Sequence, residues 1–208
     1  MLHLNTIDEK MNRLLEQFSA ADYLRNFALA GGTSLALQIG HRQSIDADMF
    51  AFTQADMEET ALLLQNDYPG ITIRRTTKVF IFCHINGIKC DFVNYANVKT
   101  IRPTQRIDDI HLYSVEDIAA MKLNAICGRG SKKDFYDIYA LLKMFSLREL
   151  LNFYDEKYMS DNSWMALKSL QYFEDANNEE SPVCIQPFPD WEKLKEAILK
   201  DVNDYKLS

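Results

Sequence analysis

The stretch FALAGGTSLALQIGHRQSIDADMFAF, residues 27–52, contains the pattern that decides the fold. Its apolar start predicts a short strand over residues 26–30. Two adjacent glycines then mark a sharp corner, and residues 33–39 are predicted to form a helix that Gly40 caps at its C-terminal end. A strand that turns directly into a helix is typical of folds in which helices pack on a sheet.

Residues 44–52 alternate between two sets of side chains, a pattern that predicts a second strand. Asp46 and Asp48 fall on one face of that strand together with Phe50. The other face, which we expect to be buried, carries the apolar set: Ile45, Ala47 and Met49. The strand therefore brings two carboxylates to about 7 Å from each other on one surface.

Hydrophobic spacing predicts the remaining elements. Helices are expected over residues 7–18, 54–67 and 114–127 with Gly128 closing the last, from 131 onward, and over 190–205; strands are expected over 71–75, 78–85 and again after residue 87. Asn86 and Gly87 favour a two-residue hairpin turn, because this pair accepts positive φ angles. Counting outward from that turn places Phe82 opposite Asp91, with His84 and Lys89 on the same face.

The four cysteines lack the spacing of a zinc site and are interpreted as small core residues that a cytosolic chain keeps reduced. The same hairpin places Cys83 opposite Cys90. A disulfide between them is the alternative, against which the expected compartment argues.

These elements predict an α/β (α+β) fold: a small mixed sheet flanked by helices, with a helical C-terminal region. We expect the sheet core and its N-terminal helix within residues 1–105 and the helical region within residues 106–208. No apolar run approaches the roughly 20 residues of a membrane span, and the amphipathic, acidic start does not resemble a signal sequence. We therefore expect a cytoplasmic protein with no membrane partner.

The net charge of −7 disfavours a general nucleic-acid binder, but the charge is unevenly distributed. Residues 71–106 contain seven basic side chains and one acid, Asp91, whereas residues 149–180 contain eight acids and two lysines. A basic middle suits a phosphate-rich ligand. The alternative is that these runs are solvated faces with no ligand.

The paired carboxylates point to a metal. Asp46 and Asp48 would repel each other unless a cation lies between them, and carboxylate oxygens are ligands that Mg²⁺ prefers. Asp91, on another predicted strand, would complete a site for two Mg²⁺ ions, or alternatively Mn²⁺. Three carboxylates around two ions are a recurrent arrangement for phosphoryl and nucleotidyl transfer. The alternative is a solvent-facing strand edge.

The glycine corner then has a candidate role. Gly31 and Gly32 let the backbone approach a ligand closely, and the helix behind them offers free N–H groups to a triphosphate. The hydroxyl groups of Thr33 and Ser34 would add two donors.

Three segments, GGTSLALQIGHRQSIDADMF, IKCDFVNY and MKLNAICGRGSKKDFYDIYALL, resemble the AbiEii/AbiGii family of nucleotidyltransferase toxins, a branch of the polymerase-beta-like nucleotidyltransferase superfamily. The resemblance covers about residues 25–145 and implies a nucleotidyltransferase core. The glycine corner and the three acids of the superfamily pattern are matched by Gly32, Ser34, Asp46, Asp48 and Asp91, and the later helical motifs by Lys122, Arg129, Asp134 and Asp137.

The resemblance implies that Lys122 and Arg129 clamp the nucleotide phosphates, since a guanidinium suits bidentate binding. Surface charge is the alternative. Asp134 and Asp137 are expected to orient these two cations, although Asp134 is also placed to act in a helix cap with Ser131.

His41 and Arg42 follow the Gly40 cap, and the resemblance implies a role for them near the nucleotide or the metal. For His41 the alternative is a loop residue bonded to backbone. We expect His84 to be exposed and without a role, and we expect core positions for the aromatic residues Phe135, Tyr136 and Tyr139.

The predicted function is transfer of a nucleotide from an NTP to an acceptor hydroxyl, with Asp46, Asp48, Asp91 and Lys122 as the catalytic residues. The resemblance implies an RNA acceptor, namely a tRNA end, growth arrest as the outcome and a cognate antitoxin as partner. Two alternatives stay open. The acceptor hydroxyl could belong to a small molecule or a protein, or the domain could bind nucleotide without catalysis.

Overall fold

The structure is a computed structural model that describes residues 1–159, 161 and 163–207. The chain divides into two compact units. We call them the sheet unit, Met1–Gly40 with Ser44–Ser114, and the helical unit, His41–Gln43 with Val115–Ser208. The sheet unit thus extends nine residues beyond the boundary expected at residue 105.

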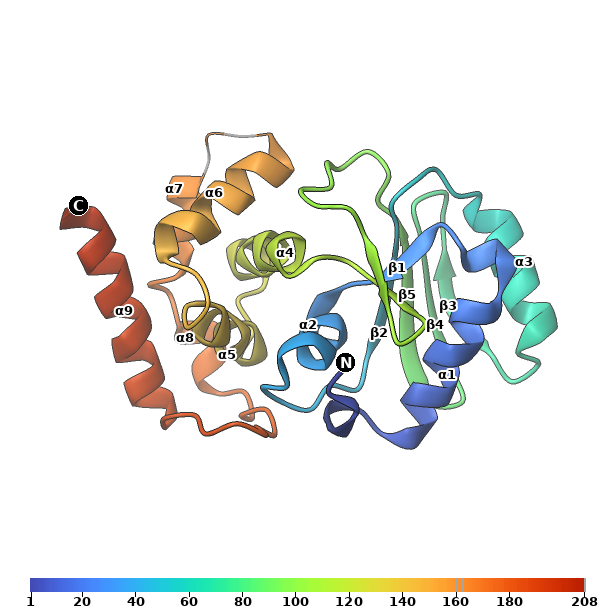
Figure 1. Ribbon diagram of the computed structural model, residues 1–208, viewed down its shortest axis with the longest axis horizontal. Coiled ribbons are helices and arrows are strands. Elements are labelled where there is room, and N and C mark those ends of the chain that lie inside the picture. The colour runs from blue at the N-terminus through green and yellow to red at the C-terminus, as the bar shows by residue number, and fades with distance from the viewer. Residues whose placement is uncertain (160, 162, 208) are drawn as a thin grey trace. The chain divides into compact units, whose positions relative to one another are not determined.

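The sheet unit is built on a seven-stranded mixed sheet with the order β3-β4-β5-β2-β1-β7-β6 (Figure 1). The strands are β1 Phe27–Leu29, β2 Ala47–Ala51, β3 Thr72–Thr76, β4 Phe80–Ile85, β5 Ile88–Asn94, β6 Gln105–Ile107 and β7 Ile110–Leu112. β2 runs parallel to β5, and β1 runs parallel to β7, while the other neighbours are antiparallel. The predicted α/β class with a mixed sheet is confirmed.

Helices cover both faces of this sheet. The helical elements of the unit are η1 Leu4–Thr6, α1 Glu9–Ala20, η2 Asp22–Leu24, α2 Gly31–Ile39 and α3 Met57–Asp67. Figure 1 shows α1 and α3 on one face of the sheet and α2 on the other. The main core lies under α1, where Phe18 meets Phe92 of β5 at 5.4 Å between ring centroids. The face that α2 partly covers carries the acids discussed below.

The predicted hairpin is present with its predicted register. Cys83 pairs with Cys90 and Phe82 pairs with Asp91 across the turn at Asn86. Both cysteines are free thiols, so the alternative of a disulfide is wrong for this structure. A hydrogen bond with Cys83, together with burial, raises the pKa of the Cys90 thiol. The two thiols therefore behave as small core residues, as expected.

Two side chains in the sheet unit differ from expectation. β2 begins at Ala47, so Asp46 precedes the strand, and Ile45 is 77% exposed instead of buried. The alternation rule fails there because the chain has not yet entered the sheet. His84 is half-buried instead of exposed, since it lies on β4 within the sheet.

The short strands β6 and β7 also differ from expectation, because helices were expected from residue 106 onward. They form a hairpin in which Arg106 pairs with His111, and β7 adds to the sheet beside β1. Strands of three residues give too short an alternation for a sequence pattern to reveal them.

The helical unit contains six α-helices among its described residues: α4 Val115–Gly128, α5 Lys132–Leu141, α6 Leu147–Tyr158, α7 Ser163–Ser169, α8 Glu174–Asn177 and α9 Trp191–Leu207. Gly128, which was expected to close this helix, lies within α4 as its last residue, and the glycine with a positive φ is Gly130, at +54°. The core positions expected for Phe135 and Tyr136 are confirmed, and Tyr139 is partly buried.

A short segment far away in sequence belongs to the helical unit. The carbonyl oxygen of His41 accepts a hydrogen bond from the Ile185 N–H, and the N–H of Gln43 donates to Val183. Arg42 forms an isolated bridge with Cys184 between these bonds. This pairing explains why His41–Gln43 is grouped with helices that follow more than 70 residues later.

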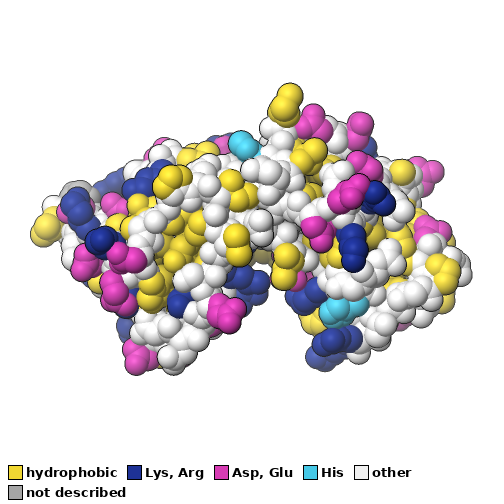
Figure 2. All heavy atoms as spheres, turned by 90° about the horizontal axis from the view of Figure 1, so that it is seen from below, with side chains coloured by type: hydrophobic (Ala, Val, Ile, Leu, Met, Phe, Trp, Pro, Cys, Tyr) yellow, Lys and Arg dark blue, Asp and Glu magenta, His cyan; other side chains and the backbone are white. Residues whose placement is uncertain are grey.

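No helix in the described ranges is both long enough and apolar enough to cross a membrane. Acidic and basic side chains are interspersed on the face that Figure 2 draws, and apolar side chains show between them. Because neither sign dominates that face, each candidate site has to be argued from the contacts of its own residues.

Candidate active site

Two of the three predicted metal ligands are direct neighbours in the sheet. Asp48 on β2 lies opposite Asp91 on β5 in a parallel register, and adjacent strands lie about 4.8 Å apart. Both residues are half-buried, and Asp46 precedes Asp48 by two positions. The structure thus brings together carboxylates that are 43 positions apart in the sequence.

Gly31 is the glycine that this arrangement requires. Its φ is +64°, and a Cβ added there would lie 2.1 Å from the carboxylate oxygen Oδ2 of Asp48. No side chain fits that space, and L residues rarely adopt that φ. The N–H of Ala30 also donates to the carbonyl oxygen of Asp48 at 2.8 Å. The glycine corner and the acid strand are therefore packed directly against each other.

Helix α2 begins at this corner with Ala30 as its N-cap residue. The methyl group of Ala30 cannot accept a hydrogen bond, so it leaves the first N–H groups of the helix uncapped by this residue. The Ser34 N–H makes the first helical bond, to Ala30 at 3.3 Å. The preceding backbone N–H groups, those of Gly31, Gly32 and Thr33, form the kind of helix N-terminus that binds anions.

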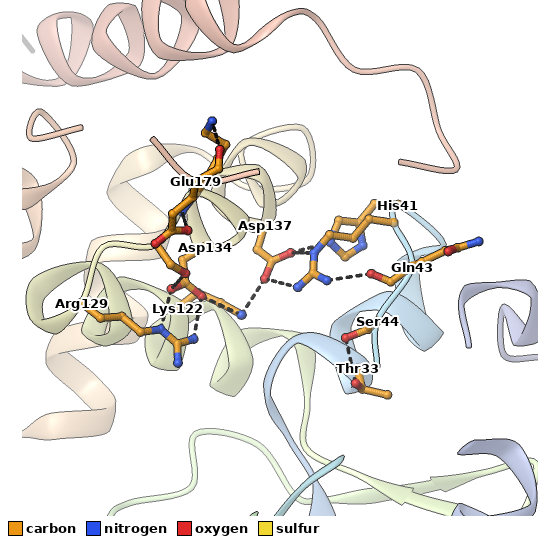
Figure 3. A network of polar contacts seen from close by, with 12 residues as sticks. Thr33, His41, Gln43, Ser44, Lys122, Arg129, Asp134, Asp137 and Glu179 are labelled. Atoms are coloured by element: carbon orange, nitrogen blue, oxygen red, sulfur yellow. Dashed lines mark hydrogen bonds and ion pairs between the residues drawn. The ribbon is translucent and has the colours of Figure 1, made fainter. Parts of the chain in front are cut away.

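The hydroxyl groups of Thr33 and Ser34 face inward. Thr33 donates to the backbone carbonyl of Asp46 and contacts the Ser44 hydroxyl at 2.8 Å, a contact drawn in Figure 3. Ser34 is fully buried and accepts a hydrogen bond from Gln38 at 3.2 Å. The Thr33 hydroxyl holds α2 against the acid-bearing chain, and the Ser34 contact lies within α2, which leaves the backbone N–H groups as the donors for a phosphate.

Lys89 is a site residue that the sequence-based set omitted. Its Nζ lies 2.7 Å from Oδ2 of Asp91, and its side chain is 48% exposed. Burial alone would lower the pKa of Lys89, but the hydrogen bond and charge of Asp91, with the charges of Asp48 and Asp46, raise it. All three predicted acids therefore act on this ammonium. Its two-residue spacing from Asp91 on one strand was the available signal.

The residues present suit a divalent cation chemically. Carboxylate oxygens are hard ligands, and the second oxygen of Asp91, Oδ1, is buried with no hydrogen-bond partner in the described chain. As they stand, no three His, Cys, Asp or Glu side chains of the described residues form a ready metal cluster. Lys89 holds the other oxygen of Asp91, so that oxygen becomes available to a metal only when the ammonium moves.

The later motif residues form a separate buried network in the helical unit (Figure 3). Asp137 is its centre: its carboxylate accepts from Arg42 Nε at 2.6 Å and Nη2 at 2.9 Å, and lies 2.7 Å from His41 Nε2. Lys122 Nζ lies 2.6 Å from its Oδ2. The residues Asp137 and His41 are fully buried. The His41 ring bonds a carboxylate through Nε2, and Nδ1 has no partner among the described residues, so the alternative of a backbone-bonded loop residue holds for the main chain of His41 and not for its ring.

Asp134 continues the network one helical turn earlier. It accepts from Arg129 at 2.9 and 3.1 Å and from Lys122 at 3.0 Å. The Ser131 hydroxyl donates to the same carboxylate at 2.7 Å, so it does not cap the helix through a backbone N–H. We name Arg42, Lys122, Arg129, Asp134 and Asp137 the ion cluster. Three cations meet two carboxylates in it, which leaves one positive charge.

The ion cluster shifts the titration of its members. Burial alone would raise the pKa of Asp134, but Lys122 and Arg129 lower it from 3.8 to about 2. Burial would likewise raise the pKa of Asp137, but the charges of Arg42 and Lys122 hold the pKa of that carboxyl well below its ordinary value. The pKa values of Lys122 and Arg42 are raised by the carboxylates in spite of burial. Both carboxylates, Lys122 and Arg42 are therefore charged at neutral pH.

The two predicted phosphate-binding cations differ in access. Lys122 is 4% exposed and already paired with two carboxylates, whereas the Arg129 side chain is 60% exposed. Lys122 could reach a phosphate only by opening its ion pairs. Arg129 is held by Asp134 and still presents its guanidinium to solvent.

The family model described as nucleotidyl transferase AbiEii toxin, of a type IV toxin–antitoxin system, matches residues 13–207. The chain belongs to the AbiEii family. The expected resemblance is confirmed over nearly the whole chain, beyond the part between residues 25 and 145 on which it was based. This AbiEii-family protein is a nucleotidyltransferase, and membership implies an NTP substrate and an antitoxin.

The AbiEii-family chain is 32% identical, over 209 residues, to a protein of Aquifex aeolicus (strain VF5) named Uncharacterized protein aq_aa25, with 97% of this chain and 98% of the relative covered. Among solved structures, a putative nucleotidyltransferase from H. pylori superposes with a TM-score of 0.55 at 17% identity, covering 96% of this chain and 95% of the other. MenT4, the nucleotidyltransferase toxin Rv2826c from Mycobacterium tuberculosis H37Rv, superposes with a TM-score of 0.57 at 14% identity, covering 92% and 83%. At these identities the two structures establish the fold of the AbiEii-family chain.

Proposed function

We propose that this protein transfers a nucleotide from an NTP to a hydroxyl group at an RNA end, namely a tRNA end, with Asp46, Asp48 and Asp91 as the catalytic centre. One observation carries the proposal. Asp48 and Asp91 are register partners on β2 and β5, packed against a glycine corner in a member of a nucleotidyltransferase family.

Nucleotidyltransferases of this fold generally use divalent metal ions. Here Asp46, Asp48 and Asp91 would hold Mg²⁺, with Mn²⁺ as the alternative, and we propose two ions. When bound, such ions stabilise negative charge on the attacking and leaving oxygens. The buried, unpartnered oxygen of Asp91 and the donor chemistry of the three acids support this assignment.

The first turn of α2 is the proposed triphosphate site. The N–H groups of Gly31, Gly32 and Thr33 carry the positive end of the helix dipole and would donate to phosphate oxygens. Ser34 supports this turn from inside instead of touching the ligand, because its hydroxyl is fully buried.

Asp91 is the proposed base. The Asp91 carboxylate oxygen that does not hold the metal would accept the proton of the acceptor hydroxyl, while the hydroxyl oxygen attacks the α-phosphorus. The bond from the α-phosphorus to its bridging oxygen then breaks, and pyrophosphate leaves. A carboxylate oxygen within hydrogen-bond reach of a hydroxyl is suited to this role.

Within the helical unit, Arg129 is the proposed anion-binding side chain, because it is exposed and lies in a cluster with one excess positive charge. Lys122 and Arg42 are assigned a positioning role: Lys122 bridges Asp134 and Asp137, and Arg42 fixes Asp137 with His41. The cluster thereby holds Arg129 through Asp134 in a fixed orientation.

The second candidate is transfer to a small molecule or to a protein hydroxyl, and the net charge of −7 favours it over RNA. A catalytically silent nucleotide-binding domain is disfavoured, because all three acids are present and two of them are adjacent.

The test is incubation of the protein with Mg²⁺, each NTP labelled at its α-phosphate, and total cellular RNA. We expect label on RNA, and we expect Asp48→Asn to reduce it by roughly 10³-fold, since several kcal/mol of charge stabilisation would be lost. Asp22→Asn, at an exposed aspartate of the same unit, is the matched control. Label on protein or on a small molecule would support the second candidate, and no label on any acceptor would contradict both.

A further inference from the structure

The β3, β4 and β5 strands, at one edge of the sheet, carry an unusual set of side chains on the face of Asp91. We name this set the stacking face: Arg75, Phe80, Phe82, His84, Lys89 and Asp91. Burial alternates along β4, where Phe80, Phe82 and His84 are half-buried while Ile81, Cys83 and Ile85 are fully buried. The half-buried set is therefore the one that faces away from the core.

The aromatic rings of the stacking face are stacked. Phe80 and Phe82 lie 4.2 Å apart between ring centroids with an interplanar angle of 13°. The Arg75 guanidinium lies over the Phe80 ring at 5.2 Å from its centroid. Both rings are only half-buried, so part of each remains open to a ligand. Two stacked, half-buried rings beside a cation offer a ligand both an aromatic surface and a positive charge.

The charge of this region is positive. Arg74, Arg75 and Lys78 are exposed on or next to β3, and Lys89 is 48% exposed on β5. From residue 71 to residue 106, Asp91 is the one acidic residue. Stacked rings surrounded by cations match the chemistry of a single-stranded nucleic acid, whose bases stack on aromatics while its phosphates need positive charge.

The stacking face leads directly to the acids. Asp48 is opposite Asp91, Asp91 is opposite Phe82, and Phe82 is opposite Arg75. Four neighbouring strands thus carry one row of acid, acid, aromatic ring and cation, with about 4.8 Å from each strand to the next. A chain bound along the row would have its end at the carboxylates.

We propose that the stacking face binds the single-stranded end of an RNA acceptor, with bases on Phe80 and Phe82, phosphates on Arg75 and Lys78, and the terminal hydroxyl at Asp91. The inference rests on the proposed function for its choice of acceptor. It adds a binding site for that acceptor and explains how an acidic protein binds RNA through local charge.

The experiment measures binding without turnover. The probe is a fluorescently labelled single-stranded RNA of about 12 nucleotides, within the span that such surfaces bind. The protein is the full chain carrying Asp48→Asn, with no NTP present, and the readout is fluorescence anisotropy across a salt series.

Two pairs of variants separate stacking and charge from general effects. Phe80→Leu with Phe82→Leu keeps the apolar volume and removes the rings, whereas Phe80→Tyr with Phe82→Tyr keeps the rings. Arg75→Glu reverses a charge on the stacking face, and Lys10→Glu makes the same change at an exposed position on α1. Circular dichroism and thermal unfolding verify that each variant is folded.

We expect the leucine pair to weaken RNA binding at least fivefold, about the least that loss of stacking on one base costs, and the tyrosine pair to bind within about twofold of the parent. Arg75→Glu should weaken binding and reduce the salt dependence by about one phosphate contact, unlike Lys10→Glu. Binding that is unchanged in the leucine pair and in Arg75→Glu would overturn the inference. The inference would also be overturned if neither the parent nor any of the variants bound RNA. A protein acceptor that binds this face, where RNA does not bind, would overturn it too.

The nucleotidyl-transfer assay above keeps the two proposals distinguishable. Label on another acceptor, without RNA binding, would overturn the stacking face and leave the transferase chemistry in place. RNA binding that depends on the rings, without any transfer, would support the stacking face and contradict the proposed function.

Discussion

The carboxylates of the sheet unit and those of the helical unit are held in opposite ways. Asp134 and Asp137 are fully buried, and each is bound by two or more side chains at 2.6–3.1 Å. Asp48 and Asp91 are half-buried register partners, and Asp91 has one oxygen on Lys89 and one without a partner in the described chain. The side chains are chemically identical and their surroundings differ.

This difference in partners separates carboxylates with a structural role from carboxylates that can take part in chemistry. A carboxylate that is fully paired stabilises the fold and offers nothing to a ligand, whereas two half-buried neighbours are stabilised further when a cation arrives. The acids of the helical unit are held by ion pairs, and the acids of the sheet unit are the ones that we propose bind a ligand.

Asp137→Asn and Asp48→Asn should differ in the size of their effect on stability. We expect Asp137→Asn to lower the free energy of unfolding by roughly 3–5 kcal/mol, because it leaves Arg42 and Lys122 buried beside a neutral amide. Asp48→Asn should lower it by much less, or not at all, since Asp48 is half-buried and lies beside the like charge of Asp91. Urea unfolding in metal-free buffer measures both. Equal losses in the two variants would contradict the contrast.

Gly31→Ala and Gly128→Ala test the glycine corner with one chemical change at two places. At Gly31 the positive φ alone costs about 1–2 kcal/mol, and the added Cβ must displace the Asp48 carboxylate, so both stability and nucleotidyl transfer should fall. At Gly128 nothing lies within 4 Å of the added Cβ, and alanine should stabilise α4 by up to about 1 kcal/mol. Thermal unfolding and the transfer assay measure the pair; full transfer by Gly31→Ala would show that Asp48 tolerates displacement.

Acid should weaken the ion cluster over a defined range. The folded pKa of Asp134 is about 2, below its ordinary 3.8, so its stabilisation is complete above about pH 4 and is lost as pH falls towards 2. The shift corresponds to about 2 kcal/mol. The free energy of unfolding between pH 5 and pH 2 (about three units) should therefore fall less in Asp134→Asn than in the parent. Parallel curves would mean that Asp134 is not held by these cations.

Arg129→Gln should have the smallest effect on stability. Its guanidinium is 60% exposed, so its ion pair with Asp134 should contribute less than about 1 kcal/mol. Nucleotide affinity should nevertheless fall by about tenfold if Arg129 binds a phosphate. Arg13→Gln is the matched control, because Arg13 is 68% exposed and also pairs with an acid. Isothermal titration with a non-hydrolysable NTP separates the two, and unchanged affinity in Arg129→Gln would remove it from the proposed site.

Much of the sheet unit could be predicted because its signals are local. The Asn86 turn fixes the pairing of β4 with β5, and alternation along β5 places Asp91 on the face opposite Cys90. The helix after the glycine corner and the positive φ of Gly40 also follow from neighbouring residues. Ile45 was misplaced because alternation gives no sign of where a strand begins.

The ion cluster could not be assembled from the sequence. Arg42 and Asp137 are 95 positions apart, and a pairing of polar side chains over that distance leaves no periodic pattern. Lys122 was placed among the phosphate-binding residues because its type and motif fit, although its environment is a buried pair of carboxylates. Burial decides whether Lys122 binds a phosphate or pairs with carboxylates. The residues next to one lysine in the sequence do not show whether its side chain is buried.

The grouping of His41–Gln43 with the helices makes the helical unit discontinuous in the sequence. A fragment that starts at Val115 would contain Asp137 and lack Arg42 and His41, two of the side chains that neutralise or hold it. Such a fragment would carry a buried, partly uncompensated charge and would be poorly able to fold alone. Truncation before Val115 should therefore not give a stable C-terminal fragment. A fusion or split version of the helical unit has to retain the segment His41–Gln43.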